Sequence, residues 1–259
     1  MKPSPRALLL SLLTAGSALL STCDRAPHPP AEPAYRPKVV FVLFDLSAST
    51  EAKDTRERYL QDFQRIVDRL QPADLMVADE ITDNPLARST FPLNEALIPP
   101  YDPLVENPRF HEGKLKMQKE AILAKARKIV LQQNEKFTRT KILDSLQLAE
   151  RVFTTYRRDR RVLVLFSDMI EESEYYNFLH EVLTPQRVSA IIAAEKSRDR
   201  LPALNGVRIY VVGAAAGIYR QMTSERFERV RDFWLEYFRA CGADLSKERY
   251  GSVLLEAPE

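Results

Sequence analysis

The sequence predicts an α/β protein with three layers, in which a mostly parallel central sheet is flanked by helices on both sides. Short apolar runs such as 39–44 and 161–166 have the composition of strands that are covered on both faces. They alternate with longer segments whose apolar residues recur at helical spacing. The 259 residues are 45% hydrophobic and 29% charged, which excludes a disordered chain and a polytopic membrane protein.

The first half of the predicted domain begins with its clearest strand. Residues 39–44 form an unbroken apolar run, which places this strand in the middle of the sheet. A helix is expected over 55–70, because its apolar residues form one stripe and its charges lie elsewhere. Residues 75–78 are predicted to form the next strand. Residues 87–93 are predicted to form a short edge strand, where Pro92 is tolerated.

The second half continues the alternation of helices and strands. Helix 224–240 carries an aromatic stripe with the spacing of a buried helix face. Cys241 follows this helix and is expected to be a small core residue without a chemical role. In chain order, the expected elements are helices 113–137 and 140–156, strand 161–166, helix 185–200, strand 207–213, helix 224–240 and strand 252–255.

The N-terminus has the pattern of an export signal. Lys2 and Arg6 precede an apolar run over 7–20, which at 14 residues is too short to span a bilayer but suits the centre of a secretory signal. Residues 1–22 are therefore predicted to be a signal peptide. Without them, bases and acids are equal in number, so a nucleic-acid partner is not expected.

The segment that ends in Cys23 resembles the lipobox of bacterial lipoproteins, through Leu20-Ser21-Thr22-Cys23. The resemblance implies that Cys23 is lipidated and anchors the protein in the bacterial cell envelope, facing the periplasm or the exterior. Asp24 resembles the signal that retains enterobacterial lipoproteins in the inner membrane. The alternatives are an ordinary cleaved signal and an uncleaved anchor. Residues 23–37 hold five prolines and are expected to form an extended tether.

Oxygen-bearing side chains follow the two clearest strands, at the edge of the sheet where ligands collect in such folds. Asp45, Ser47 and Ser49 come directly after the first strand, and Asp168 follows the run 161–166. Thr140 opens a helix between them. One site with carboxylates, hydroxyls and waters suits Mg²⁺ better than a closed Ca²⁺ cage.

These motifs resemble a von Willebrand factor A domain. Asp45-x-Ser47-x-Ser49, the run Thr-x-Ile-x-x-x-Leu-x-x-Ala that starts at Thr140, and Asp168 after a strand match that family in order. The resemblance implies a Rossmann-type domain over 38–256. It also implies a metal-ion-dependent adhesion site, in which these five residues hold Mg²⁺, Mn²⁺ or Ca²⁺.

Two loops depart from the family's pattern. Residues 136–139 replace the glycines that usually precede the family's threonine, so Thr138 is a rival to Thr140 as a ligand. Met169 stands where the family usually has glycine after the aspartate. Both loops are expected to lie somewhat differently around an ion.

Several of these residues also have ordinary structural explanations. Ser49 and Thr50 could cap the helix near residue 55, and Asp168 could be a turn residue. The neighbouring acids Asp79, Glu80, Asp83, Glu171 and Glu172 are expected to be solvated. His111 and His180 have no second histidine at ligand spacing, so zinc is not expected. The basic cluster 157–161 fits either a helix end or a patch for phosphate or lipid headgroups.

The function that these features favour is non-catalytic binding. A metal held by protein oxygens would keep one position open, and an acidic side chain of a partner protein would complete its coordination. The alternative is a metal-dependent phosphohydrolase of the haloacid dehalogenase type. Such enzymes need a second aspartate at the position of Ser47, and a hydroxyl cannot replace it as an acid and base. A scaffold with a vestigial metal site is the third interpretation.

Overall fold

A computed structural model describes residues 35–258, except residue 88 and the segments 132–138 and 215–222. Arg36–Glu259 form one compact unit. The predicted signal peptide, Cys23, Asp24 and most of the tether lie outside the described residues, and so does Thr138. In the described part of the chain, no helix combines the length and apolar character that a bilayer span requires.

A six-stranded sheet forms the centre of this unit, in the order β3-β2-β1-β4-β5-β6. All neighbouring strands are parallel except β2 and β3, which are antiparallel. The predicted fold class, a mostly parallel sheet in a three-layer α/β arrangement, is confirmed. The strands are β1 (Lys38–Asp45), β2 (Leu75–Ile81), β3 (Leu93–Ala96), β4 (Arg160–Phe166), β5 (Arg208–Val212) and β6 (Tyr250–Gly251).

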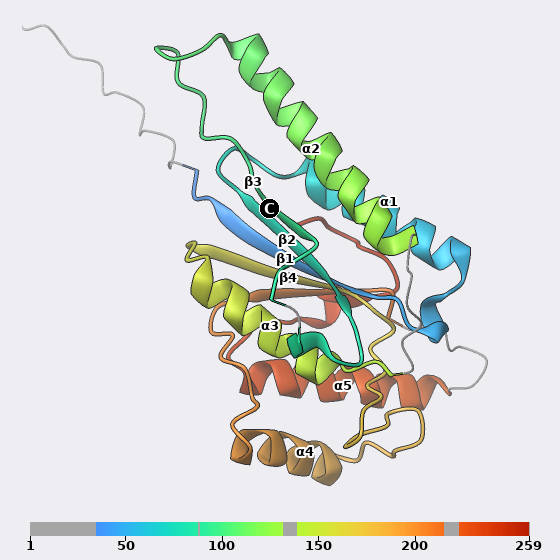
Figure 1. The fold of residues 1–259 in the computed structure, drawn as a ribbon. Coiled ribbons are helices and arrows are strands. Elements are labelled where there is room, and N and C mark those ends of the chain that lie inside the picture. Colours follow the sequence, from blue (N-terminus) through green and yellow to red (C-terminus); the bar gives the residue numbers. More distant parts are fainter. Residues whose placement is uncertain (1–34, 88, 132–138, 215–222, 259) are drawn as a thin grey trace, which may run out of the picture. The chain divides into compact units, whose positions relative to one another are not determined.

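Helices cover both faces of the sheet (Figure 1). One face packs against α1 and α2, and the other against α3, α4 and α5. The α-helices are α1 (Lys53–Asp68), α2 (Pro108–Leu131), α3 (Ile142–Thr155), α4 (Pro185–Ser197) and α5 (Ser224–Ala240). Three 3₁₀ turns complete the described elements, η1 (Ala48–Thr50), η2 (Pro85–Ala87) and η3 (Lys247–Arg249).

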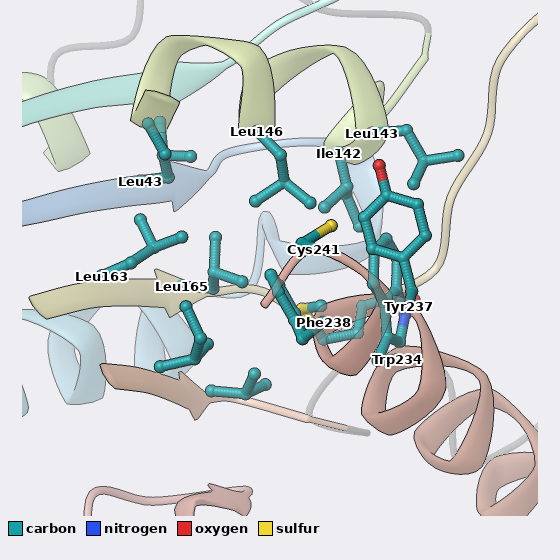
Figure 2. Packing of buried hydrophobic residues seen from close by; sticks show 14 of the residues in the cluster. Leu43, Ile142, Leu143, Leu146, Leu163, Leu165, Trp234, Tyr237, Phe238 and Cys241 are labelled. Atoms are coloured by element: carbon teal, nitrogen blue, oxygen red, sulfur yellow. The ribbon is translucent and has the colours of Figure 1, made fainter. Parts of the chain in front are cut away.

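The hydrophobic core divides into one layer on each face of the sheet, because successive side chains of a strand point to opposite faces. In β1, Phe41 and Leu43 belong to the layer under α3 and α5, whereas Val42 and Phe44 belong to the layer under α1 and α2. Figure 2 shows the layer under α3 and α5, where Leu43 and leucines of β4 face α3 and the aromatic side chains of α5. Cys241 is a free, buried cysteine in this layer, as predicted.

Two predicted strands are misplaced. Residues 87–93 do not form the edge strand. Proline has no N–H to donate, and β3 pairs with β2 only after Pro92, over Leu93–Ala96. The predicted strand 252–255 is also wrong, because β6 ends at Gly251 and the N–H of Leu254 bonds to Asp62 of α1 instead.

Candidate metal centre

The carboxyl ends of two adjacent parallel strands bring Asp45 and Asp168 to the same edge of the sheet. Asp45 is the last residue of β1, and the neighbouring strand β4 ends at Phe166, which is paired with Phe44. Asp168 follows two residues later. Both carboxylates are buried, with at most 1% of either residue exposed. The convergence that the sequence predicted for these two residues is therefore observed.

Both oxygens of Asp45 accept hydrogen bonds from neighbouring loops. The backbone N–H of Ser47 donates to Oδ1 at 3.0 Å, and the hydroxyl of Ser167 donates to Oδ2 at 2.7 Å. The Ser167 bond joins the ends of β1 and β4 directly. Ser167 was not among the predicted ligands, although its place between the fourth strand and Asp168 is the signal that could have identified it.

The serine hydroxyls after β1 are not helix caps. Helix α1 begins after Ala52, and no side chain makes a capping bond there. Instead, the Ser47 and Ser49 hydroxyl oxygens lie 3.0 Å from each other. Thr50 donates its hydroxyl to the carbonyl oxygens of Asp45 and Ser47, which fixes the turn. The capping alternative for Ser49 and Thr50 is therefore wrong.

Asp168 has one oxygen in a turn and one without a hydrogen bond. Oδ1 accepts the N–H of Ile170 at 3.0 Å, as an ordinary turn aspartate would. Oδ2 is buried and has no hydrogen-bond partner of normal geometry in the described part of the chain. Burial and the nearby charge of Asp45 raise the pKa of Asp168 to about 7, although the Ser49 hydroxyl opposes the shift. Turn formation alone does not account for this second oxygen.

Burial also raises the pKa of Asp45, and the hydroxyls of Ser47 and Ser167 lower it in part. The positive charge of Arg56 also lowers the pKa of Asp45, by less than these hydrogen bonds do. The Arg56 guanidinium donates to the carbonyls of Leu46 and Val130. Arg56 thus offsets the effect of burial on the pKa of Asp45 only in part.

Thr140 lies beside the loop that contains Asp168. It is buried, and its backbone forms an antiparallel bridge with Glu172 through hydrogen bonds of 3.1 Å and 2.9 Å. The bridge brings the start of α3 to the segment after β4. Thr138, the rival position, falls in the segment 132–138, outside the described residues.

Glu171 is buried, with 1% of the residue exposed, so the prediction of a solvated helix start is wrong for it. Its Oε2 accepts the N–H of Leu143 at 3.0 Å in the first turn of α3, where Lys141 provides no side-chain cap. Burial raises the pKa of Glu171 to about 8. Asp79 is likewise buried and belongs to β2, which runs three residues further than predicted.

Met169 adopts a left-handed backbone conformation, with φ of 65°, in the position where glycine was expected. Its side chain is buried in the core, and its carbonyl accepts the indole N–H of Trp234 at 2.9 Å. Helix α5 therefore holds the loop next to Asp168. Sequence alone did not predict this contact, because the two residues are 65 positions apart.

The donor set fits a hard divalent cation. Carboxylate and hydroxyl oxygens are the ligands such ions prefer, and two buried acids with raised pKa values favour a positive charge beside them. The described residues contain no group of three or more His, Cys, Asp and Glu side chains placed to hold a metal. A metal at this edge would therefore depend on the hydroxyls of Ser47, Ser49 and Thr140 as well as on the two carboxylates.

Comparison with known proteins gives matches among solved structures only. No family model matches the chain, and no curated protein does. The matches include a von Willebrand factor type A protein from Catenulispora acidiphila, at 12% identity over 82% of this chain and 44% of that chain, with a TM-score of 0.41. The pilus adhesin SpaC from Lactobacillus rhamnosus GG matches at 10% identity over 84% of this chain and 29% of that chain, with a TM-score of 0.45.

The manganese-loaded TRAP protein of Plasmodium vivax matches at 13% identity over 72% of this chain and 60% of that chain, with a TM-score of 0.38. The chain spans less than two thirds of the length of each of these structures. Likenesses of this strength do not assign a metal or a partner to the chain, and the contacts around Asp45 and Asp168 carry the functional argument.

Proposed function

We propose that the protein is a non-catalytic binding module of the von Willebrand factor A type. In this proposal, Asp45, Ser47, Ser49, Thr140 and Asp168 hold Mg²⁺, Mn²⁺ or Ca²⁺. An acidic side chain of a protein partner binds to the metal. The metal supplies a positive charge with a coordination position that the protein does not fill.

The observation that carries the proposal is the buried pair Asp45 and Asp168, in which one oxygen of Asp168 has no hydrogen bond of normal geometry from the described residues. Two neighbouring buried carboxylates repel each other, and an unpaired buried charge is costly. A bound divalent cation would remove both penalties and would use the hydroxyls that α1 does not use as caps.

Hydrolytic chemistry is less well supported by this site. In a phosphohydrolase of the haloacid dehalogenase type, the residue corresponding to Asp45 would be the nucleophile. Here both of its oxygens accept hydrogen bonds, and Ser47 stands where the acid and base would be. We therefore propose binding rather than catalysis.

The proposed location is the bacterial cell envelope, with the chain anchored by a lipid on Cys23. A mass spectrum of the mature N-terminus tests this part independently of the metal site. Acylated Cys23 as the first residue is the expected result, and an unmodified N-terminus at another position would contradict it.

Calorimetric titration of the full chain with MnCl₂ and MgCl₂ tests the metal site. Binding is expected for the unaltered protein and is expected to be lost in Asp45→Asn and Asp168→Asn. Asp74→Asn is the matched control, because Asp74 is also fully buried but lies at the opposite edge of the sheet, where it bonds to the backbone of Lys38. Equal metal binding by all four proteins would contradict the proposal.

Partner chemistry is tested with peptides that contain a single Asp or Glu, compared with the same peptides carrying Asn or Gln. Binding is expected only for the acidic peptides and only without EDTA. Binding that survives EDTA and Asp45→Asn would instead support a scaffold with a vestigial site. Measurable phosphatase turnover that Asp45→Asn abolishes would support the enzyme.

A further inference from the structure

The amino edge of the sheet, opposite the candidate metal centre, carries exposed apolar side chains among basic ones. Strand β3 runs antiparallel to β2, so Ala96 at its end lies opposite Leu75, the first residue of β2. The chain then continues into α2. The side chain of Gln118 bonds to the backbone of Ala96 and Ile98, which fixes this part of α2 at the amino edge. The first turns of α2 extend past the ends of the strands (Figure 1).

Four large apolar side chains are exposed in and just ahead of this extension. The exposed fractions are 94% for Leu104, 78% for Val105, 61% for Phe110 and 70% for Met117. Phe110 and Met117 are seven residues apart and so lie on one face of α2. That face is not the one that packs on the protein, because the buried residues of α2 are His111, Ile122, Ala126, Ile129 and Val130. Exposed apolar side chains grouped in this way mark an interaction surface.

Basic side chains of α2 lie among these apolar residues. Helix α2 holds seven Lys and Arg residues against two Glu residues, although the chain as a whole is nearly balanced in charge. The loop ahead of α2 adds Asp102 and Glu106, so the excess of positive charge lies in the helix rather than in the loop. Arg109 and Lys116 are exposed within the extension. The Lys114 ammonium lies 4.4 Å from the centre of the Phe110 ring and bonds to Glu106, which ties the preceding loop to α2.

The same edge carries further positive charge and is where the chain enters the domain. Arg157 and Arg158 are exposed directly before β4, and the first residue of β4, Arg160, is paired with Lys38 at the start of β1. A chain anchored ahead of residue 35 would therefore enter the domain at this edge. We call the exposed residues at this edge the amino-edge surface, which consists of Leu104, Val105, Arg109, Phe110, Lys114, Lys116 and Met117.

We infer that the amino-edge surface docks the domain on an anionic lipid surface. Basic side chains bind the headgroups while apolar ones enter the boundary with the acyl chains, which is how interfacial helices bind membranes. A second copy of the chain fits less well, because a symmetric contact would place the same positive charges against each other. A nucleic acid offers no hydrocarbon for Phe110 and Met117. The inference does not depend on the metal site.

Cosedimentation with vesicles tests the inference, using the chain from residue 23 onward with Cys23→Ser, so that neither a lipid on the protein nor the apolar run 7–20 contributes. Binding to vesicles of phosphatidylcholine and phosphatidylglycerol is expected to exceed binding to phosphatidylcholine alone and to weaken with salt. Each basic residue near an anionic membrane strengthens binding about fivefold. Arg109→Glu with Lys116→Glu is therefore expected to weaken binding by at least about 25-fold.

Lys53→Glu with Lys196→Glu is the matched control, since it changes the net charge equally at exposed positions on α1 and α4. It is expected to leave most of the binding intact. Equal loss in both variants, or no gain from phosphatidylglycerol, would overturn the inference and point to a protein partner for this surface.

Insertion of the apolar residues is tested separately by fluorescence. Phe110→Trp is expected to show quenching by brominated lipids when anionic vesicles are added. Val182→Trp provides the control, because Val182 is exposed to a similar degree in the loop before α4. Quenching at both positions or at neither would contradict docking through α2.

Discussion

Asp168 is a single residue whose buried charge destabilises the folded protein. Its carboxylate is buried beside Asp45, and its pKa rises to about 7 from the usual 3.8. Between these values the folded protein holds a proton that the unfolded chain has released. Folding then takes up a proton, so the stability of the metal-free protein falls as pH rises through this range.

We predict that Asp168→Asn removes part of this pH dependence. In EDTA, the free energy of unfolding of the unaltered protein is expected to fall between pH 5 and pH 8. The variant is expected to be more stable than the unaltered protein at pH 8 by on the order of 2 kcal/mol, since it carries no charge to bury. Urea denaturation at both pH values measures the change, and a variant less stable at pH 8 would contradict the assignment.

Glu171 gives a second prediction, because it caps α3 from another loop. Glu171→Gln keeps an oxygen for the Leu143 N–H and is expected to preserve most of the stability near pH 6. Glu171→Ala leaves that N–H unpaired and is expected to cost about 1–2 kcal/mol. Since its pKa is about 8, Glu171 also adds to the loss of stability with rising pH, and Glu171→Gln should remove that share.

The role of Glu171 is tested without metal by comparing the melting temperatures of the unaltered protein, Glu171→Gln and Glu171→Ala at pH 6. The unaltered protein and Glu171→Gln should unfold at similar temperatures, and Glu171→Ala should unfold first. An alanine variant as stable as the glutamine variant would show that the cap contributes little.

Residue patterns predicted part of the site and failed for the rest. Asp45 and Asp168 were identified because each directly follows an unmistakable strand. The burial of Glu171 was not predicted, because its sequence neighbours Glu172 and Ser173 are polar. It is buried only because the segment after β4 pairs with Thr140, a contact between positions 32 residues apart that no local pattern records.

At the scale of elements, helix α5 holds the loop next to Asp168 through a hydrogen bond from Trp234. The indole bond to the Met169 carbonyl and the buried Met169 side chain hold the loop after β4 in place, and the Phe233 ring packs edge to face against Trp234. The left-handed conformation of Met169 costs on the order of 1 kcal/mol, which burial of its side chain outweighs.

Trp234→Phe is therefore predicted to weaken Mn²⁺ binding as well as to destabilise the protein by about 1–3 kcal/mol, because the Met169 carbonyl loses its donor. Phe238→Leu is the control, since Phe238 lies in the same core layer and its side chain has no group that could donate a hydrogen bond to the loop after β4. The control should lower stability by a similar amount but leave Mn²⁺ affinity, measured by calorimetry under folded conditions, unchanged. Equal metal affinity in both variants would contradict the supporting role of α5.

Elements with strong periodicity were predicted closely, and weakly patterned ones were not. The predicted helix 224–240 coincides with α5, whose stripe of aromatic residues faces the core. By contrast, β3 and β6 contain four and two residues, too few to show a period. Their positions depend on the strands with which they pair, and the sequence of a short segment does not show which strand that is.

At the scale of the whole molecule, metal binding and proton binding compete for the same buried carboxylates. A ligand that binds only the folded state stabilises it by about 2.7 kcal/mol at a concentration 100 times its dissociation constant. At pH 5, a proton occupies Asp168, whose pKa is about 7, and the metal must displace it. Mg²⁺ is therefore predicted to raise the melting temperature more at pH 8 than at pH 5.

Differential scanning calorimetry with and without MgCl₂ at the two pH values measures this effect. Asp168→Asn should show little shift at either pH, and Asp74→Asn should respond as the unaltered protein does, from a lower starting temperature. A Mg²⁺ shift that is larger at pH 5 would contradict the proposed ligands.

The central strand β1 joins the two ends of the molecule on which the proposals rest. The chain enters at Lys38, the candidate metal ligand Asp45 is the last residue of the strand, and β1 is hydrogen bonded to β2 on one side and to β4 on the other along its length. If a captured partner pulled against the anchor, the tension would run along the axis of β1. The backbone hydrogen bonds from β1 to β2 and from β1 to β4 would then have to break together rather than one after another. A strand loaded in this direction resists mechanical force well.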